Sequence, residues 1–368
     1  MKKILILCTT DSMIYNFLIS HIKELKNNNY EIECACSKTG FYFNDIKKEC
    51  KIKMHELNFT RTPLSIRNLI AYKNLSRIVK NNKYDIIFCH EPVGGVMGRL
   101  VGHKNKCKII YMAHGFHFFK GAPLKNNILY YNIEKYFSKY TDILITINNE
   151  DYMNSTEKFK AKKNIKLNGI GIDTTKFVTK KNDYLRKKYN LKKNDILLLS
   201  VGELIDRKNH IVVIKAIEKM KNKNLHYFIA GDGKNTQKLQ QYIKEHHLEN
   251  NIHLLGYCKN INELCNSVDI FVFPSLQEGL SVALMEAMAC GNLIIASKIR
   301  GNVDLIDEEK GGFLVEANNI SDYITSINKA ITEIKNKEKY SNYNKEKIKL
   351  FDIQHIKNDI IQLINERW

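Results

Sequence analysis

Short apolar runs alternate with segments of helical periodicity in two successive series along this 368-residue chain. In the first series we expect strands at residues 4–8, 32–36, 86–89, 109–112 and 143–147, with helices at 15–26, 66–80 and 128–139. In the second series we expect strands at 196–201, 227–230, 252–255, 270–273 and 293–296, with helices at 211–221, 234–246 and 282–288. Because such alternation is typical of parallel α/β sheets, it predicts two doubly wound, Rossmann-like domains in tandem.

The boundary between the domains is expected near residues 165–173, where Gly169 and Gly171 interrupt the pattern and Asp173 can cap the next segment. The predicted domains are therefore residues 1–170 and 171–350. Beyond Gly312 the pattern is helical and basic, and residues 351–368 are expected to form a C-terminal helix that packs back on the first domain.

Composition narrows the class of protein. Hydrophobic residues make up 44% of the chain and aromatic residues 10%, which is typical of a globular protein. No run approaches the ~18 apolar residues of a spanning helix, and the apolar start ends at Thr9, too early for a secretory signal. Nine cysteines without a Cys-x-x-Cys pair favour neither disulfides nor zinc. We expect a cytoplasmic protein, soluble or peripheral on the inner face of the cytoplasmic membrane.

The formal net charge of +19 has three possible explanations: a compositional bias toward Lys, an anionic membrane surface, or a nucleic acid. No Arg-rich patch interleaved with aromatic residues supports nucleic acid, so none is expected as a partner. The segment 124–140 is rich in Tyr, Phe and Lys, and it is either a helix that rests on an anionic membrane or a packed domain helix.

Two acids, Glu278 and Glu286, bracket a glycine turn between the expected strand 270–273 and a helix that begins near Ser281. The first N–H groups of a helix are unpaired and attract an anion such as phosphate. One carboxylate lies before the helix and the other inside it, so an elongated ligand can be held at both hydroxyl-rich ends with its phosphates between them. This pattern predicts a nucleotide-sugar site, although acids near a helix start often only complement its dipole.

Ligands of open α/β sheets bind at the carboxyl ends of the strands, so residues that follow strands are the other candidates. Gly202 is followed by Arg207 and Lys208, which we expect to meet a diphosphate. Gly231 opens a Gly-Asp-Gly turn that lacks the third glycine of a dinucleotide fingerprint. Tyr257 is either a wall for a nucleobase or a packing aromatic.

In the first series, His114 comes directly after the strand 109–112, and we expect it to face the reactive centre. The chain has no Asp-x-Asp sequence and no metal-ligand cluster, so neither a metal nor a cofactor is expected. Lys208, Arg207 and helix amides would then stabilise the charge of the leaving group.

On these residues the chain resembles the family 4 retaining glycosyltransferases of the GT-B fold. The segment from Glu278 to Glu286 matches the family's E-x7-E signature, which residues 287–291 continue, and Gly202, Lys208, residues 231–233 and residues 168–177 match other family segments. Residues 114–123 are similar to a capsule and exopolysaccharide branch. The implied architecture is two Rossmann-like domains facing each other across a cleft, the first binding the acceptor and the second the nucleotide sugar.

The resemblance implies metal-independent, retaining transfer of a hexose or N-acetylhexosamine from a UDP-sugar to a glycan acceptor, most simply one linked to polyprenyl diphosphate, in surface polysaccharide biosynthesis. It assigns catalytic roles to Glu278, Lys208 and His114. Glu286 would bind the ribose hydroxyls. The remaining implied substrate contacts are Arg207, Gly202, Gly279, Leu280, Ser281, Val282, Tyr257, Gly231 and Thr10.

Two departures from the family pattern are visible. Glu203 stands where the family usually has Arg, so Arg207 is the expected substitute, and residues 9–15 replace a glycine-rich loop without any glycine. Two rival functions stay open at this point: a UDP-sugar epimerase on the same fold, and a non-catalytic binder of nucleotide sugars or polyanions.

Overall fold

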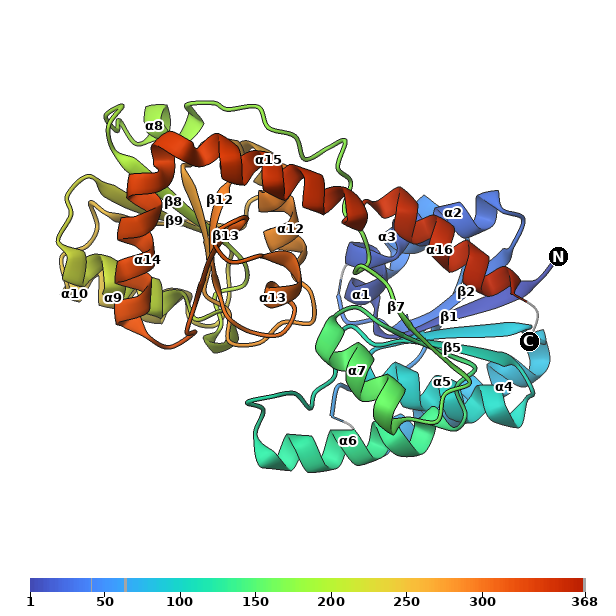
Figure 1. Ribbon diagram of the computed structural model, residues 1–368. Coiled ribbons are helices and arrows are strands. Elements are labelled where there is room, and N and C mark those ends of the chain that lie inside the picture. Colours follow the sequence, from blue (N-terminus) through green and yellow to red (C-terminus); the bar gives the residue numbers. More distant parts are fainter. Residues whose placement is uncertain (41, 63–64, 367–368) are drawn as a thin grey trace. The chain divides into compact units, whose positions relative to one another are not determined.

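The computed structural model describes residues 1–40, 42–62 and 65–366. These residues form two compact units (Figure 1). The first unit comprises Met1–Ile170 together with the chain from Ile356 onward, and the second comprises Gly171–His355. Each unit is built on its own parallel sheet.

The sheet of the first unit has seven strands in the order β3-β2-β1-β4-β5-β6-β7. The chain leaves the middle of the sheet toward one edge and then returns to build the other, which is the doubly wound arrangement. Strands in the middle of the sheet are buried almost throughout, as expected for a parallel sheet covered on both faces. The strand bounds are β1 (Lys3–Thr10), β2 (Glu31–Ser37), β3 (Lys53–Glu56), β4 (Ile86–His90), β5 (Lys108–Met112), β6 (Ile143–Thr146) and β7 (Lys163–Lys166).

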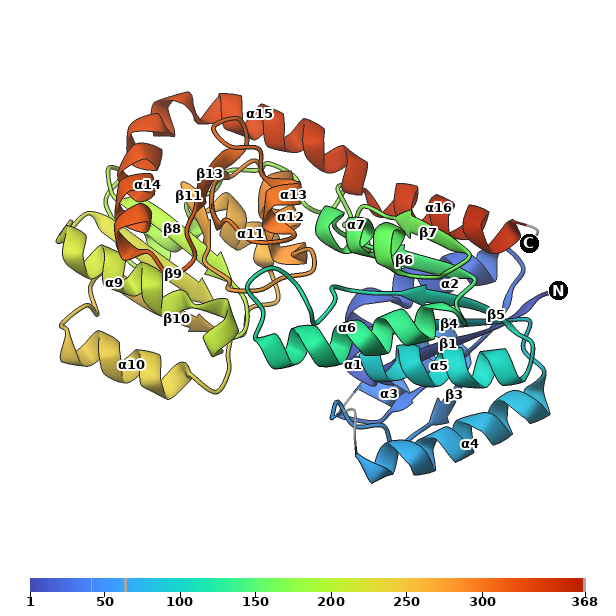
Figure 2. The same ribbon diagram turned by 60° about the horizontal axis from the view of Figure 1, so that its bottom comes forward.

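Helices cover both faces of this sheet. The helix bounds are α1 (Asp11–Phe17), α2 (Ile19–Asn27), α3 (Tyr42–Cys50), α4 (Ile66–Asn82), α5 (Pro92–Lys104), α6 (Leu124–Ser138), α7 (Asn149–Lys158) and α16 (Ile353–Asn365). Helices α4, α5 and α6 lie side by side on one face (Figure 2). On the other face, Lys357 of α16 lies 3.6 Å from Glu24 of α2, and Lys163 pairs with Glu366 at 2.7 Å.

The five strands expected in this half are present, but β3 and β7 were not predicted. Each has only four residues and a half-buried, lysine-containing sequence, so its apolar signal is weak. The single helix expected at 15–26 is wrong, because the chain forms α1 and α2 with a break at Leu18. Residues 9–15 are no loop either: β1 runs to Thr10 and α1 begins at Asp11. The last two residues of the predicted C-terminal helix, 367 and 368, lie outside the described residues.

The sheet of the second unit has six strands in the order β10-β9-β8-β11-β12-β13. Its strands are β8 (Ile196–Val201), β9 (Leu225–Ala230), β10 (Ile252–Gly256), β11 (Ile270–Phe273), β12 (Leu293–Ser297) and β13 (Gly312–Val315). Its helices are α8 (Tyr184–Lys188), η1 (Asp206–Lys208), α9 (His210–Met220), α10 (Thr236–Glu245), α11 (Ile261–Asn266), α12 (Val282–Ala289), α13 (Asn302–Leu305), α14 (Ile320–Glu333), η2 (Ile334–Asn336), α15 (Lys337–Ile348) and η3 (Lys349–Phe351).

Strands β8 and β11 have the bounds that the sequence predicted, whereas β13 corrects the expectation of a purely helical chain beyond Gly312. A Cβ atom on Gly312 would lie 2.3 Å from the carbonyl oxygen of Ile294, so the glycine lets β13 approach β12 closely. The helical and basic pattern begins only after this strand.

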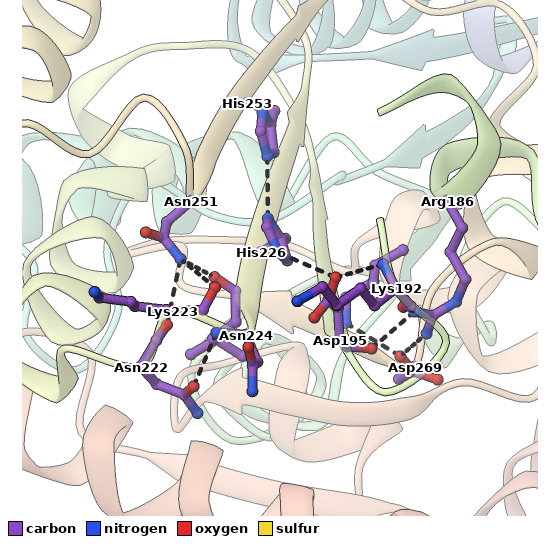
Figure 3. Close-up of polar contacts among 12 residues, drawn as sticks. Arg186, Lys192, Asp195, Asn222, Lys223, Asn224, His226, Asn251, His253 and Asp269 are labelled. Atoms are coloured by element: carbon purple, nitrogen blue, oxygen red, sulfur yellow. Dashed lines mark hydrogen bonds and ion pairs between the residues drawn. The ribbon is translucent and has the colours of Figure 1, made fainter. Parts of the chain in front are cut away.

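A polar network ties together the strand starts of the second sheet (Figure 3). His253 Nε2 lies 3.4 Å from His226 Nδ1, and His226 Nε2 lies 3.7 Å from the Asp195 carboxylate. Arg186 donates to the Asp195 carbonyl at 2.8 Å and to the Asp269 carboxylate at 2.9 Å. Burial lowers the pKa of His226 and brings that of His253 to about 4. The polar groups here bond one another, so this edge of the sheet serves structure.

Candidate active site

Glycines form the opposite, carboxyl edge of the second sheet. Gly202, Gly231 and Gly256 lie at the ends of the neighbouring strands β8, β9 and β10. The Gly202 N–H donates to the Ala230 carbonyl at 2.9 Å, and the Gly231 N–H donates to the Gly256 carbonyl at 2.8 Å. A Cβ atom on Gly231 would lie 1.9 Å from the carbonyl oxygen of Gly202. These strand ends therefore carry backbone without side chains, and at Gly231 the glycine lets the chain pass close to the Gly202 carbonyl.

The turn between β11 and α12 has the form that the sequence predicted. Ser281 is the N-cap of α12, and its side chain accepts a hydrogen bond from the Leu284 N–H at 3.3 Å. Within the described part of the chain, the N–H groups of Gly279 and Leu280 donate no hydrogen bond. Unpaired amides beside a helix N-terminus suit a phosphate group.

Arg300 and Gly301 support this turn from the segment after β12. The Arg300 Nε donates to the carbonyl of Glu278 at 3.1 Å. Gly301 has a φ of +81°, and a Cβ atom there would lie 2.4 Å from the carbonyl oxygen of Gly279. Both residues therefore fix the path of the backbone that carries Glu278.

Glu278 is nearly buried and forms two ion pairs. Its Oε1 lies 2.8 Å from Lys208 Nζ and 3.0 Å from Arg207 Nη1. Burial by itself would raise the pKa of this carboxyl, but Lys208 and Arg207 outweigh it, so the pKa of Glu278 lies below its usual value. Arg207 also donates to the Gln277 carbonyl at 2.8 Å. The ammonium of Lys208 has three donors, of which Glu278 takes one; it also lies 4.8 Å from the centroid of the Phe273 ring, and it makes no other hydrogen bond within the described residues.

Glu286 is the opposite case. Its carboxylate is half-buried on α12 and has no hydrogen-bond or ion-pair partner among residues 1–40, 42–62 and 65–366. Burial raises its pKa to about 7, and the nearby charge of Lys176 only partly opposes that shift. A desolvated carboxylate without a partner is poised to accept hydrogen bonds from ligand hydroxyls.

Two further predicted positions are open to solvent. Tyr257 is 75% exposed, so the interpretation of it as a packing aromatic is wrong. Glu203 is exposed as well. In this structure it is Arg207, not Glu203, that contacts the acid-bearing turn.

In the first unit, His114 follows β5 and pairs with a second histidine. Its Nε2 lies 3.0 Å from Nδ1 of His90, which ends β4. Burial lowers the pKa of His114 to about 3, with a smaller contribution from His21. Burial also holds the pKa of His90 well below its usual value. The pair is therefore neutral near pH 7 and can contribute hydrogen bonds but no charge.

Glu91 follows His90 and has a backbone conformation that favours glycine, with φ 61° and ψ 160°. Such a conformation costs on the order of 1–3 kcal/mol for other residues and is common at functional sites. Its carboxylate accepts the N–H groups of Thr9 at 2.8 Å and Thr10 at 3.3 Å. Thr10 Oγ1 also lies 3.1 Å from Ser12 Oγ. The predicted substrate contact Thr10 therefore has its amide bonded inside the protein.

Sequence reasoning missed His90, Glu91 and Arg300. His90 is the last residue of the buried strand β4 and Glu91 follows it, and polar residues at such a place are a usable signal, whereas Arg300 has none. No group of three or more His, Cys, Asp or Glu side chains among the described residues is arranged to hold a metal ion. Within that same part of the chain, none of the helices combines the length and apolarity of a membrane-spanning segment.

Comparison with known proteins agrees with this architecture. Residues 181–347 match the family of glycosyl transferases group 1, and residues 3–148 match the glycosyl transferase 4-like family. The chain is similar to a Bacillus subtilis (strain 168) protein named "Putative glycosyltransferase EpsD", with 34% identity over 325 residues, covering 86% of this chain and 84% of the relative.

A second relative is the UDP-Gal:alpha-D-GlcNAc-diphosphoundecaprenol alpha-1,3-galactosyltransferase of Escherichia coli, 28% identical over 315 residues, or 82% of this chain and 80% of that one. Among solved structures, Anabaena Alr3699/HepE in complex with UDP has a TM-score of 0.82 at 18% identity, with 99% of each chain covered. The fold is thus GT-B, and the chain belongs to the GT4-like glycosyltransferases.

Proposed function

We propose that this glycosyltransferase moves a hexose or N-acetylhexosamine from a UDP-sugar to a lipid-linked glycan, with retention of the anomeric configuration, in surface polysaccharide biosynthesis. The observation that carries the proposal is the carboxyl edge of the second sheet. Along that edge lie glycine backbone, the unpaired amides of Gly279 and Leu280, the cations Arg207 and Lys208, and the Glu286 carboxylate, which has no partner among the described residues.

Each group has a role that follows from its surroundings. Glu286, which has no partner in the described part of the chain, accepts the ribose hydroxyls. The amides of Gly279 and Leu280 and the free donors of Lys208 bind the diphosphate. As the sugar leaves UDP, negative charge grows on the diphosphate, and fixed donors stabilise that charge more than the ground state.

Glu278 contacts the transferred sugar and also holds the two cations in place. Its pair with Lys208 and Arg207 keeps it ionised, so it accepts hydrogen bonds from sugar hydroxyls. Gly202, Gly231 and Tyr257 complete the donor surface, and Ser281 and Val282 present the helix start.

The first unit supplies the acceptor side in this proposal. His114, held by His90, offers a neutral imidazole that donates or accepts a hydrogen bond at a sugar hydroxyl. A lipid-linked acceptor is supported by the name of the Escherichia coli relative, which acts on a diphosphoundecaprenol-linked sugar. Such an acceptor lies at a membrane, so we also propose a cytoplasmic enzyme that works peripherally at the inner face. We propose no metal or cofactor besides the donor.

The test is transfer by the purified full-length chain from UDP-glucose, UDP-galactose and their N-acetyl forms to a polyprenyl-diphosphate-linked sugar. We expect one donor to be used, with an α-linked product detected by NMR. Release of UDP at the same rate without acceptor, together with an altered free sugar, would instead indicate an epimerase. No turnover combined with salt-sensitive UDP binding would indicate a polyanion binder.

A further inference from the structure

The outer side of α4 exposes aliphatic side chains that a solvent-facing helix normally lacks. Ile66 is 74% exposed, and Leu69 and Ile70 are exposed as well. Residues at i, i+3 and i+4 share one helix face, so the three form a single apolar patch on the first turns of α4. The opposite side of the same helix is packed into the core through Ala71, Leu75 and Val79.

Helix α6 repeats this feature two helices away. Leu124 is 74% exposed and Ile128 57%, and Leu129 and Tyr136 are also exposed. Tyr131, on another side of the helix, packs against the core of the unit. A helix that is apolar on both its inner and outer sides is usually covered on both, so the outer side of α6 fits a partner surface.

The charge of this helix layer is strongly one-sided. The sequences of α4 and α5 contain no Asp or Glu, and the one acid of α6, Glu134, is buried and pairs with Arg99 at 2.8 Å. The cations of α4 and α6 that lie on the outside are Arg67, Lys73, Arg77, Lys80, Lys125 and Lys135. Within the described chain, none of these six forms an ion pair with a carboxylate.

The helices on the opposite face of the same sheet differ. Helices α2 and α3 carry Glu24, Asp45 and Glu49 beside their lysines, and Lys23 pairs with Glu49 at 2.7 Å. The excess of unpaired positive charge is therefore a property of the layer of α4, α5 and α6. Helix α7, which lies beside α6, again carries acids, namely Glu150, Asp151 and Glu157, so the acid-poor stretch ends at α6.

The two apolar patches lie at the same end of the layer. Helix α4 follows β3 and α6 follows β5, so the first turns of both helices stand at the carboxyl edge of the sheet, with α5 between them (Figure 2). Aliphatic side chains flanked by unpaired cations are the two features by which a protein surface binds an anionic bilayer: the apolar groups enter the lipid and the cations meet the headgroups.

We propose that the outer side of α4 and α6 is the surface on which this enzyme docks on an anionic membrane. The inference rests on the proposed function, because only a membrane-borne acceptor requires such a surface. A second copy of the chain fits less well, since face-to-face pairing would bring two unneutralised basic layers together. Docking through the first turns of both helices brings the carboxyl edge of the first sheet, with His114, toward the lipid surface.

The experiment is co-sedimentation of the full-length protein with vesicles of phosphatidylcholine alone or mixed with phosphatidylglycerol. We expect binding only to the mixed vesicles, and weaker binding as NaCl rises. The double variants Leu69→Glu/Ile70→Glu and Ile128→Glu/Leu129→Glu should each lower the partition coefficient by about tenfold or more. Leu350→Glu is the matched control, because Leu350 is 62% exposed in the second unit and should bind like the wild type.

UDP binding by calorimetry keeps a failure of this inference distinct from a failure of the proposed function. The helix variants should bind UDP like the wild type while losing vesicle binding. Two results would overturn the docking surface and leave the proposed function intact. One is equal vesicle binding by the wild type and all variants, and the other is a wild type that binds UDP but no vesicles. A dimer in the wild type that the helix variants abolish would assign this face to self-association and overturn the membrane proposal.

Discussion

The carboxyl edges of the two sheets occupy equivalent places in the same kind of fold, yet the residues at their strand ends differ in type. In the second unit three neighbouring strands end in or just before a glycine, at Gly202, Gly231 and Gly256, which bring no side chain to the edge. In the first unit the strand ends carry side chains that bond one another, as in the His90–His114 pair and in Glu91, which takes the amides of Thr9 and Thr10.

The electrostatics follow the same division. At the edge of the second sheet the charged Glu278 carboxylate pairs with two cations and Glu286 has no partner among the described residues, whereas His90 and His114 of the first sheet are neutral. A parallel sheet directs ligands to its carboxyl edge. The ligand that such an edge binds depends on the residues at its strand ends. Glycines leave the backbone uncovered, whereas polar side chains cover it and bond one another.

The largest effect should come from removing the Lys208 cation at the carboxyl edge of the second sheet. Lys208→Ala should lower kcat/KM for transfer by about 10²–10³-fold, because the leaving diphosphate loses a fixed donor. Lys234→Ala is the matched control, since Lys234 is an exposed lysine that pairs with Asp206, and its activity should match the wild type. Equal loss in both variants would show a general charge effect and break the comparison.

The bare backbone is tested by two glycines. Gly231→Ala would place a Cβ atom 1.9 Å from the Gly202 carbonyl oxygen, so we expect it to destabilise the second unit by about 3 kcal/mol or more. Gly256→Ala meets no atom within 4 Å and should cost only the strain of its φ of +68°, about 1–2 kcal/mol. Thermal unfolding followed by circular dichroism compares the two, and similar melting temperatures would contradict close approach at Gly231.

A pH titration of donor binding tests Glu286. Its pKa of about 7 means that the carboxylate is protonated as pH falls through 7 and loses capacity to accept ribose hydroxyls. UDP affinity should therefore drop up to about tenfold from about pH 8 to about pH 6. Glu286→Gln should bind UDP weakly across this range without that slope. A wild-type profile as flat as that of the variant would remove Glu286 from the site.

The Glu286 carboxyl should also make the free energy of unfolding depend on pH, in the direction opposite to that of UDP affinity. Its pKa is raised above the value for an unfolded chain, so its contribution favours folding at low pH and is lost as pH rises toward about 7. Glu286→Gln should then be more stable than the wild type near pH 8, by thermal unfolding, while binding UDP less well. Reduced stability at pH 8 would indicate that the carboxylate has a structural partner.

The smallest effect is expected for the histidines at the carboxyl edge of the first sheet. The pKa values of His114 and His21, about 3 and about 4, predict that their ring proton resonances do not move in NMR spectra between about pH 6 and about pH 8. A titration of His114 near pH 6.5 would show a solvated, chargeable imidazole and weaken the contrast between the two edges.

Strands and turns with a strong local signal were predictable from sequence. The run that became β11 is wholly apolar, the run that became β8 is apolar except for Ser200, and the Ser281 cap follows a glycine turn. The short strands β3, β7 and β13 were not predictable, because pairing with a neighbouring strand, rather than their own pattern, makes them strands. Gly312 illustrates this, because it is a glycine only so that β13 can lie close to Ile294 of β12.

The site divides in the same way. Glu278, Lys208 and Glu286 could be selected because their residue types and positions after strands suggest a ligand. The pair of Glu278 with Lys208 joins residues 70 positions apart and cannot be read locally, and neither can the lack of a partner for Glu286 among residues 1–40, 42–62 and 65–366. The neutral His90–His114 pair and the contact of Arg300 with the Glu278 carbonyl are tertiary in the same sense.

Calorimetric titration of UDP into the full-length chain shows whether the carboxyl edge of the second sheet holds a nucleotide diphosphate. If it does, one UDP binds per chain, the affinity is at least about tenfold weaker in Lys208→Ala, and the affinity is unchanged in Lys234→Ala. Absence of UDP binding by the folded wild type, or equal affinity in all three proteins, would contradict UDP binding at this edge.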